Sequence, residues 1–362
     1  MAASGSGLDG VIAAETRLSD VDGERGRLIL AGHDVEAWAG QVSFEAAAAQ
    51  FLGGEPAALA HALGNGREAA FARRDRLGDA LLAKDGMDAL RASVAHLPGD
   101  SSPAEVVGAV AVYAAAWSRL AAGKEPLAPD PSAGHAADYL RMVRGAPAGA
   151  AEVAALEAYL VTVIDHGMNA STFAARVVAS TGSDLVSSVV AAIGALKGPL
   201  HGGAPGPVLD MLDAVGAPER ARAWVAAELA AGRRIMGMGH RIYRVRDPRA
   251  AVLERAIAKL ESSPEAGSRP GGRLALARAV ERAAEEALAA MHPERPLKAN
   301  VEFYTAVILD AVGLPRTLFT PTFTASRSVG WCAHVAEQRA TGRLIRPSSR
   351  YVGPMPATHS ES

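Results

Sequence analysis

The sequence predicts an all-α protein with one small β-hairpin near its start. Ala, Leu, Glu and Arg recur in blocks of about ten to twenty residues that Gly and Pro interrupt, a pattern typical of helices. The strand signal is confined to residues 11–18 and 27–30, which flank the turn-rich Asp20-Val21-Asp22-Gly23. With 362 residues, 49% of them hydrophobic, the chain can build one large core or two domains sharing an interface.

Two helices and two loops can be placed from local signals. Ser102-Pro103-Ala104-Glu105 is a capping box with Pro at the first helical position, so it predicts a helix running through Trp117. Residues 151–164 form a second helix by composition. Residues 261–273 are polar and rich in Pro and Gly, which indicates a surface loop, and the tail after Gly353 is expected to fray.

Charge and composition exclude several classes of protein. The formal net charge of -2 leaves no general basic field, so we expect no nucleic-acid partner. Cys332 is the single cysteine, which rules out an intrachain disulfide and a cysteine-based zinc site. The N-terminus lacks the features of a secretory signal, and the most apolar stretch, residues 185–196, is too short to span a bilayer. We therefore expect a cytoplasmic protein with no membrane association.

Two segments place histidines in loops. His166 and Asn169 occur in DHGMNAST, and His201 lies between a proline and paired glycines in KGPLHGGAP. Glycines let the backbone approach a ligand closely, which favours a binding loop. The alternative is that His201 is an ordinary surface histidine.

A third segment, GMGHRIYRVRDPR, combines His240 with four arginines within nine residues. Asp247 followed by Pro248 predicts a helix start, which puts Arg249 in a first turn that already favours anions. The arginines, Arg244 and Arg249 among them, could bind carboxylates or phosphates, or could form a solvated basic face. The glycine pair is not a dinucleotide-binding loop, because the third glycine is missing.

A fourth segment, NVEFY, leads a helix that ends at Gly313-Leu314-Pro315. Asn300 is a plausible N-cap, and Glu302 then falls in the first turn. That carboxylate could be functional, or it could only complement the helix dipole. Arg327 and Arg346 follow in the C-terminal region, and each alone would be interpreted as a surface residue. We interpret His334 as a packed helical residue and Cys332 as an inert thiol.

Other catalytic motifs are absent from the sequence. There is no G-x-S-x-G elbow, no phosphate-binding G-x-x-x-x-G-K-[ST] loop and no H-E-x-x-H pair. The histidines at 166, 201 and 240 lack metal-ligand spacing, so we expect no metal.

Taken together, the segments resemble the citrate synthase family. KGPLHGGAP, GMGHRIYRVRDPR, NVEFY and the helix with Arg327 occur in the family's order, with Arg346 after them. The resemblance extends from residues 7–11 to residues 344–353, so it covers nearly the whole chain, although residues 40–150 match more loosely.

The resemblance implies a large helical domain and a smaller mobile one. The large domain would comprise residues 1–202 and 313–362, and the small domain residues 203–312. The family works as homodimers, and the resemblance implies that Arg346 completes the active site of the neighbouring subunit.

The resemblance also implies a role for each candidate residue. Glu302 would remove a proton from the methyl group of acetyl-CoA, His201 would hydrogen-bond the thioester oxygen, and His240 would protonate the ketone oxygen of oxaloacetate. The substrate-binding set would hold oxaloacetate, and Arg244 is a candidate for the phosphates of CoA. No cofactor is implied, because carboxylate and imidazole handle every proton. The implied substrate-binding set is His166, Asn169, Arg249, Arg327 and, from the partner, Arg346.

The sequence departs from the family pattern at the base, where Glu302 replaces the usual Asp. Glutamate keeps the carboxyl group but is one methylene longer than aspartate. A misplacement of the catalytic carboxylate by about 1 Å can cost on the order of a hundredfold in rate. We expect an active citrate synthase whose pocket accommodates Glu302, and which condenses acetyl-CoA with oxaloacetate and then hydrolyses the thioester. Two alternatives remain: a 2-methylcitrate synthase that uses propionyl-CoA, and a non-catalytic protein that binds oxaloacetate or CoA for regulation.

Overall fold

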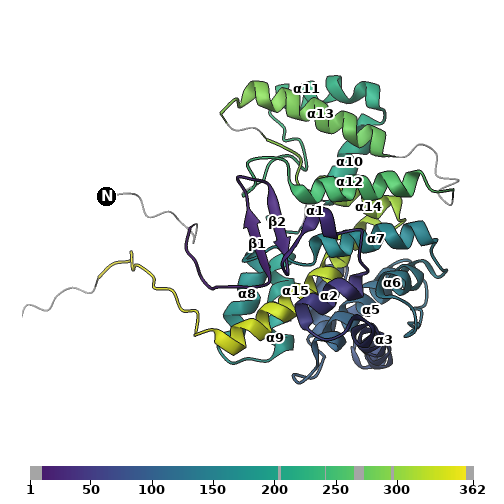
Figure 1. Cartoon of the computed structure of the whole chain (residues 1–362), viewed down its shortest axis with the longest axis vertical. Coiled ribbons are helices and arrows are strands. Elements are labelled where there is room, and N and C mark those ends of the chain that lie inside the picture. Colours follow the sequence, from purple (N-terminus) through teal and green to yellow (C-terminus); the bar gives the residue numbers. More distant parts are fainter. Residues whose placement is uncertain (1–9, 203–204, 241, 265–272, 295–296, 356–362) are drawn as a thin grey trace, which may run out of the picture.

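The computed structural model describes residues 10–202, 205–240, 242–264, 273–294 and 297–355, and it confirms the all-α prediction (Figure 1). The first nine α-helices are α1 (Val35–Trp38), α2 (Phe44–Leu52), α3 (Pro56–Arg73), α4 (Gly86–Val94), α5 (Pro103–Ala121), α6 (His135–Arg144), α7 (Ala150–Val163), α8 (Ala170–Ala179) and α9 (Leu185–Leu196). They are followed by α10 (Pro205–Val215), α11 (Ala221–Ala230), α12 (Pro248–Glu261), α13 (Arg273–Met291), α14 (Val301–Ala311) and α15 (Phe319–Thr341). Short 3₁₀ turns cover Arg74–Arg76, Ala80–Leu82, Pro218–Arg220 and Arg316–Leu318.

The β-structure is a three-stranded antiparallel sheet in the order β1-β2-β3. The strands are β1 (Ser19–Asp22), β2 (Arg27–Leu30) and β3 (His33–Asp34). The predicted hairpin is present, but the first strand was placed wrongly at residues 11–18. The Asp-Val-Asp sequence that suggested a turn pairs with β2 along its whole length, and the turn falls on residues 23–26 instead.

Helix α5 forms the centre of the larger part of the molecule. The predicted capping box is present: Ser102 Oγ accepts from the Glu105 N–H at 3.3 Å, and Glu105 Oε2 accepts from the Ser102 N–H at 2.8 Å. Helices α3, α4, α6 and α15 pack around α5. Among the described helices only α5 is long and apolar enough to cross a membrane, but 78% of its apolar window is buried within the fold. Its burial identifies it as the core helix of this part.

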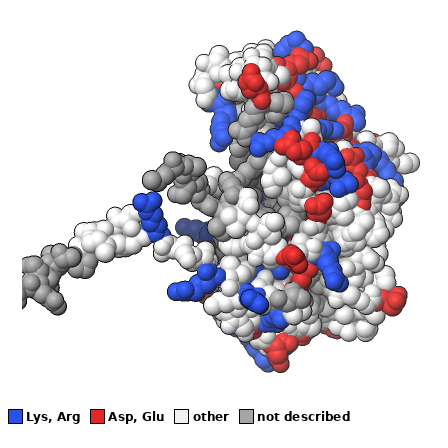
Figure 2. All heavy atoms as spheres, turned by 60° about the vertical axis from the view of Figure 1, so that its left-hand side comes forward, with Lys and Arg blue, Asp and Glu red and all other residues white. Residues whose placement is uncertain are grey.

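Helices α11 and α13 lie at one end of the molecule, beside α10 and α12 (Figure 1). Helix α12 connects this end to the rest, because it packs on both α7 and α14. Both terminal segments leave the body on the same side in Figure 1. On the face drawn in Figure 2, positive and negative side chains mix over the α11–α13 end, while the larger part shows wide uncharged areas.

Two predicted loops fall partly outside the described residues. Helix α12 ends at Glu261 and α13 begins at Arg273, which agrees with a break in helix between them, but residues 265–272 lie outside the description. The tail is described to residue 355 and has no helix or strand after α15.

Candidate active site

One cavity of about 740 Å³ gathers most of the residues singled out from the sequence. Its walls come from the N-terminal segment, the loop before α8, the loop after α9, the segment leading into α12, the start of α14 and the first half of α15. The predicted residues that line it are His166, Asn169, His201, His240, Arg249, Glu302 and Arg327.

A short backbone pairing sets His240 beside the start of α14. Met238 forms an isolated antiparallel bridge with Ala299, and the Asn300 N–H donates to Gly237 O at 2.9 Å. Gly237 has a φ of 74°, and a Cβ there would lie 2.9 Å from Phe303 Cβ. The close approach requires glycine, so this glycine serves the pairing and not a nucleotide.

Asp247 joins three parts of the cavity wall. Its Oδ1 accepts from the Arg249 N–H and Nε, each at 3.0 Å, and its Oδ2 accepts from Arg249 Nη2 at 2.7 Å. The same Oδ2 accepts from the Val301 N–H at 3.1 Å. One buried carboxylate therefore caps α12, contacts the N-terminus of α14 and orients the Arg249 guanidinium.

Arg327 presents an unsatisfied donor to the cavity. Its guanidinium lies 4.5 Å from the Phe323 ring centroid, and its Nε donates to Val163 O at 2.7 Å. Its buried Nη2 has no hydrogen-bond partner among the described residues. Burial lowers the pKa of Arg327 to about 10, so it remains charged at neutral pH. A buried cation with an open donor is suited to a carboxylate.

The hydrogen bonds of His240 fix its tautomer. Its Nδ1 accepts from the backbone N–H groups of Ile242 and Tyr243 at 3.0 and 3.1 Å, so the neutral ring carries its proton on Nε2. Arg249 Nη2 lies 3.5 Å from Nε2, at the limit of a hydrogen bond, so the two shorter backbone bonds to Nδ1 decide the tautomer. Burial, with a smaller effect from Arg249, lowers the pKa of His240 to about 4. His240 is thus a neutral N–H donor.

His201 has the opposite tautomer. The Ser171 N–H donates to His201 Nε2 at 3.3 Å, so this nitrogen accepts and Nδ1 carries the proton. Burial, followed by the charge of Arg327, lowers the pKa of His201 to about 4. Asn169 lies close by, and its Oδ1 accepts from the N–H groups of Ser171 and Thr172 to cap α8.

His166 contacts the segment that carries His240. Its Nε2 lies 3.1 Å from the hydroxyl of Tyr243, a buried residue of the His240 segment. Burial, with Arg249 as the next cause, holds the pKa of His166 well below its usual range. Neither Tyr243 nor Ser171 was identified from the sequence, because only the folded geometry pairs them with His166 and His201.

Glu302 differs electrostatically from what its position predicts. The first turn of a helix favours an anion, and Asn300 does cap α14 as predicted, with its Oδ1 accepting from the Glu302 N–H at 3.0 Å. Burial nevertheless raises the pKa of Glu302 to about 7, against the opposing charges of Arg249 and Arg327. Loss of hydration therefore outweighs the helix dipole, and the carboxylate titrates near neutral pH.

The remaining predicted residues lie outside this cavity. Arg244 is exposed, with its N–H donating to Gly23 O at 2.9 Å. Arg346 is exposed on the segment after α15, where it lines a separate cavity of about 510 Å³. Arg246 is paired with Glu254 and Glu281, so it has a structural role.

Cys332 and His334 on α15 are both buried, as the sequence analysis predicted. Burial raises the pKa of the Cys332 thiol to about 12, which leaves it unreactive. His334 is buried as predicted, although it is also hydrogen-bonded to charged side chains. Among the described residues, no group of three or more His, Cys, Asp and Glu side chains is arranged to hold a metal ion.

The sequence profile described as "Citrate synthase, C-terminal domain" matches residues 7–348. The chain belongs to the citrate synthase family. This confirms the resemblance inferred from the four motifs, and the profile spans every residue of the candidate site.

Curated relatives within the family carry two names. A putative citrate synthase 2 of Mycobacterium tuberculosis is 48% identical over 204 residues, which is 56% of this chain and 52% of that protein, so the chain spans about half the length of this relative. The citrate synthase of Haloferax volcanii is 36% identical and covers 96% of this chain and 95% of its own. A 2-methylcitrate synthase of Mycobacterium tuberculosis is 37% identical, with 96% and 90% covered.

Solved citrate synthase structures share the fold. The enzyme from Thermotoga maritima superposes with a TM-score of 0.82 at 33% identity, covering 97% of this chain and 96% of that chain. The enzyme from Thermoplasma acidophilum, solved as a ternary complex with carboxymethyl coenzyme A and oxaloacetate, gives 0.84 at 27% identity, covering 98% and 97%.

Proposed function

We propose that this chain is a citrate synthase, which joins the methyl carbon of acetyl-CoA to the ketone carbon of oxaloacetate and then hydrolyses the thioester to citrate and CoA. The observation that carries the proposal is the single cavity in which a carboxylate with a pKa of about 7 lies among three histidines and two buried arginines. That arrangement provides a base, neutral hydrogen-bond donors and carboxylate-binding groups together.

Each proton transfer has a group in place. Glu302 takes a proton from the methyl carbon, and the Nδ1–H of His201 stabilises the enol or enolate at the thioester oxygen. As the new C–C bond forms, the Nε2–H of His240 supplies a proton to the ketone oxygen of oxaloacetate. The imidazolate that this leaves takes up the proton that Glu302 removed, so both groups return to their starting states. Arg249 and Arg327 hold the carboxylates of oxaloacetate, and His166 contributes a further contact. Water then cleaves the thioester and releases CoA.

A second cavity gives CoA a place to lie. It has a volume of about 590 Å³, shares Gly239 and His240 with the site, and is also lined by Arg233, Arg234 and His292. Arg234 and His292 could meet the phosphates of CoA while its thioester reaches His240, whereas Arg233 is already paired with Glu228. Arg244 lines neither cavity, so its predicted role in binding CoA stays a prediction.

We further propose a homodimer in which Arg346 enters the neighbouring site. Arg346 is exposed. The segment before β1 and the segment after α15 also expose apolar side chains that a neighbouring subunit could cover. Val11 and Ala13 line both the cavity of Arg346 and the active-site cavity, which puts the terminal segments close to the site. The large apolar residues that these two segments expose are Val11, Ile12, Leu344, Tyr351, Val352 and Met355.

The proposed small domain, residues 203–312, would close over residues 1–202 and 313–362 when oxaloacetate binds. His240, Arg249 and Glu302 lie on the one side of this division, and His166, His201 and Arg327 on the other. Closure would exclude water from the enolate and bring the two sets together.

Paired thiol-release assays test the proposed function. Oxaloacetate is supplied with either acetyl-CoA or propionyl-CoA, and we expect the higher kcat/KM with acetyl-CoA. A preference for propionyl-CoA would make the chain a 2-methylcitrate synthase, a function that the 37% identical relative keeps open. One methylene is worth only about 1–3 kcal/mol in an apolar pocket. No thiol release with either substrate, together with measurable oxaloacetate binding, would support the regulatory alternative.

A further inference from the structure

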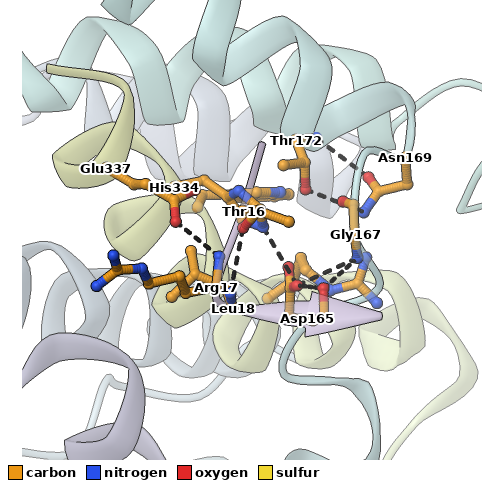
Figure 3. A network of polar contacts seen from close by, with 12 residues as sticks. Thr16, Arg17, Leu18, Asp165, Gly167, Asn169, Thr172, His334 and Glu337 are labelled. Carbon is orange, nitrogen blue, oxygen red and sulfur yellow. Dashed lines mark hydrogen bonds and ion pairs between the residues drawn. The ribbon is translucent and has the colours of Figure 1, made fainter. Parts of the chain in front are cut away.

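A network of polar contacts joins Asp165 and Gly167, the two chain neighbours of His166, to helix α15 (Figure 3). At its centre, His334 of α15 makes two hydrogen bonds that fix its tautomer. Its Nδ1 lies 2.9 Å from Arg176 Nη1, a donor, and its Nε2 lies 3.2 Å from Asp165 Oδ2. The guanidinium can only donate, so Nδ1 accepts and the Nε2–H donates to Asp165. All three side chains are buried.

At one end of the network, Asp165 holds the backbone on both sides of His166. Its Oδ2 accepts from Ser19 Oγ at 2.5 Å and from the Gly167 N–H at 3.1 Å. Ser19 Oγ also accepts from the Gly167 N–H at 2.9 Å. Gly167 has a φ of 58°, and its carbonyl accepts from Asn169 Nδ2 at 3.1 Å. The backbone that aims the His166 ring is therefore held by the residues directly before and after it.

At the other end, Arg176 connects the same network to both terminal segments. Its Nη1 donates to Glu337 Oε2 at 2.7 Å, and Glu337 Oε1 accepts from the Arg17 N–H at 2.9 Å. Its Nε donates to Gln338 Oε1 at 2.9 Å, and Gln338 Nε2 donates to Arg343 O at 3.1 Å. The N-terminal segment and the segment that leads to Arg346 are thus hydrogen-bonded to the group that orients His334.

We propose that Arg176, His334 and Asp165 are positioning residues for His166. They do not line the active-site cavity, and they act by holding the backbone of residues 165–167 so that the His166 ring points at oxaloacetate. The role in binding oxaloacetate rests on the proposed function. Loss of a link should loosen the His166 loop and weaken oxaloacetate binding, while the acetyl-CoA side of the site is left intact.

The test compares His334→Ala with His334→Gln and with a matched control, His135→Ala. His135 is also a buried histidine beside a buried arginine, with Nδ1 at 3.3 Å from Arg67 Nη1, but it lies on α6 away from the cavity. All variants are purified as the full chain and melted thermally. Oxaloacetate Kd is measured by calorimetry, and KM for each substrate and kcat by thiol release.

We expect His334→Ala to weaken oxaloacetate Kd and KM by about tenfold, the scale of one lost buried hydrogen bond, with acetyl-CoA KM unchanged. His334→Gln, which can both accept from Arg176 and donate to Asp165, should restore most of that loss. His135→Ala should lower the melting temperature without changing oxaloacetate Kd.

Equal changes in oxaloacetate Kd for His334→Ala and His135→Ala, or none in either, would overturn the positioning role. If His334→Ala does not fold, Ser19→Ala is used instead, because it removes only the hydrogen bond from the partly exposed Ser19 to Asp165. An unchanged oxaloacetate Kd in Ser19→Ala would also overturn the positioning role. Wild-type turnover tests the proposed function separately, because calorimetry measures the binding of oxaloacetate even if no thiol is released.

Discussion

Asp247 and Arg249 form a bidentate ion pair in the wall of the cavity. Arg249 Nε donates to Asp247 Oδ1 at 3.0 Å, and Arg249 Nη2 donates to Asp247 Oδ2 at 2.7 Å. The pair is buried, and the same carboxylate accepts from the N–H of Val301. The guanidinium is therefore oriented before any substrate arrives, and its position is tied to the start of the helix that carries Glu302. Preorganisation of this kind reduces the cost of binding a carboxylate.

The Asp247→Asn variant should bind oxaloacetate at least about tenfold more weakly, because the amide cannot pair with both guanidinium nitrogens. It should also lose about 3 kcal/mol of stability, since removing one charge leaves the other buried. Calorimetry and urea unfolding measure the two effects. Asp138→Asn is the control, because Asp138 pairs with the buried Arg67 far from the cavity. Asp138→Asn should lose stability but keep the wild-type affinity for oxaloacetate. If Asp247→Asn and Asp138→Asn bind oxaloacetate equally well, Asp247 does not orient Arg249 for the substrate.

The rate should depend on pH through Glu302. The base must be ionised, and burial places its pKa at about 7, so kcat/KM should rise from pH 6 and level off above pH 8. His201 and His240, with pKa values lowered to about 4 by burial, stay neutral across this range and should not add a second step. A pH–rate profile measures this directly. A rate that is flat between pH 6 and 8 would exclude Glu302 as the essential base with this pKa.

Glu302→Gln should stabilise the folded protein at alkaline pH while it abolishes turnover. The folded-state pKa of about 7 lies above the ordinary value of 4.5, so the folded state holds this proton more tightly than the unfolded state does. In wild type, the stability that this tighter proton binding contributes is fully present below pH 4.5 and is lost as the pH rises through 7. The variant should therefore gain up to about 3 kcal/mol in unfolding free energy at pH 8 and little at pH 4.5.

Denaturant unfolding at the two pH values measures this gain. Glu55→Gln, at an exposed position before α3, serves as the control and should behave like wild type at both. If Glu302→Gln is no more stable than wild type at pH 8, the carboxylate is better solvated than its burial indicates.

The parts of the fold that the sequence predicted are those that depend on neighbours in the chain. The caps at Ser102, Asp247 and Asn300 are all present, because each needs only a side chain and the N–H groups two or three residues later. The motifs also gave the family and most of the residues that line the cavity. The first strand was misplaced because a strand needs a partner, and only the register with β2 shows where its pairing begins.

The parts that were missed depend on distances that no local pattern contains. His166 and Tyr243 lie 77 residues apart, and Asp165 and His334 lie 169 apart. The raised pKa of Glu302 could not be predicted from its helix position, since the larger effect, burial, comes from the whole cavity. The roles of Arg244 and Arg346 stay predictions, because neither lines the cavity of its own chain.

Arg346 should act in the neighbouring subunit. Arg346→Ala and His240→Ala subunits should each be nearly inactive alone, because each homodimer lacks one group in both sites. In a mixed dimer, one site receives a wild-type His240 together with a wild-type Arg346 from the partner, and the other site lacks both. Mixing differently tagged variants and purifying the heterodimer should therefore restore up to about half of the wild-type activity, by the symmetry of a twofold dimer. An inactive purified heterodimer would show that Arg346 does not complete the neighbouring site.

Glu302→Asp restores the usual family residue, yet we expect it to be slower than wild type. The backbone of α14 is anchored where the residue begins: Asp247 Oδ2 accepts from the Val301 N–H, and Asn300 Nδ2 donates to Gly239 O at 2.8 Å. The helix therefore cannot easily advance to make up for one lost methylene, and the shorter carboxylate would stop short of the methyl carbon. A shift of about 1 Å can cost on the order of a hundredfold, so we expect a rate about 10–100-fold lower.

Exchange of acetyl-CoA methyl protons into deuterated water, with a non-reacting oxaloacetate analogue bound, isolates this step from the later ones. Glu302→Gln sets the floor of the assay. Faster exchange in Glu302→Asp than in wild type would mean that the pocket is fitted to the shorter acid, and it would favour the regulatory alternative over an enzyme adapted to Glu.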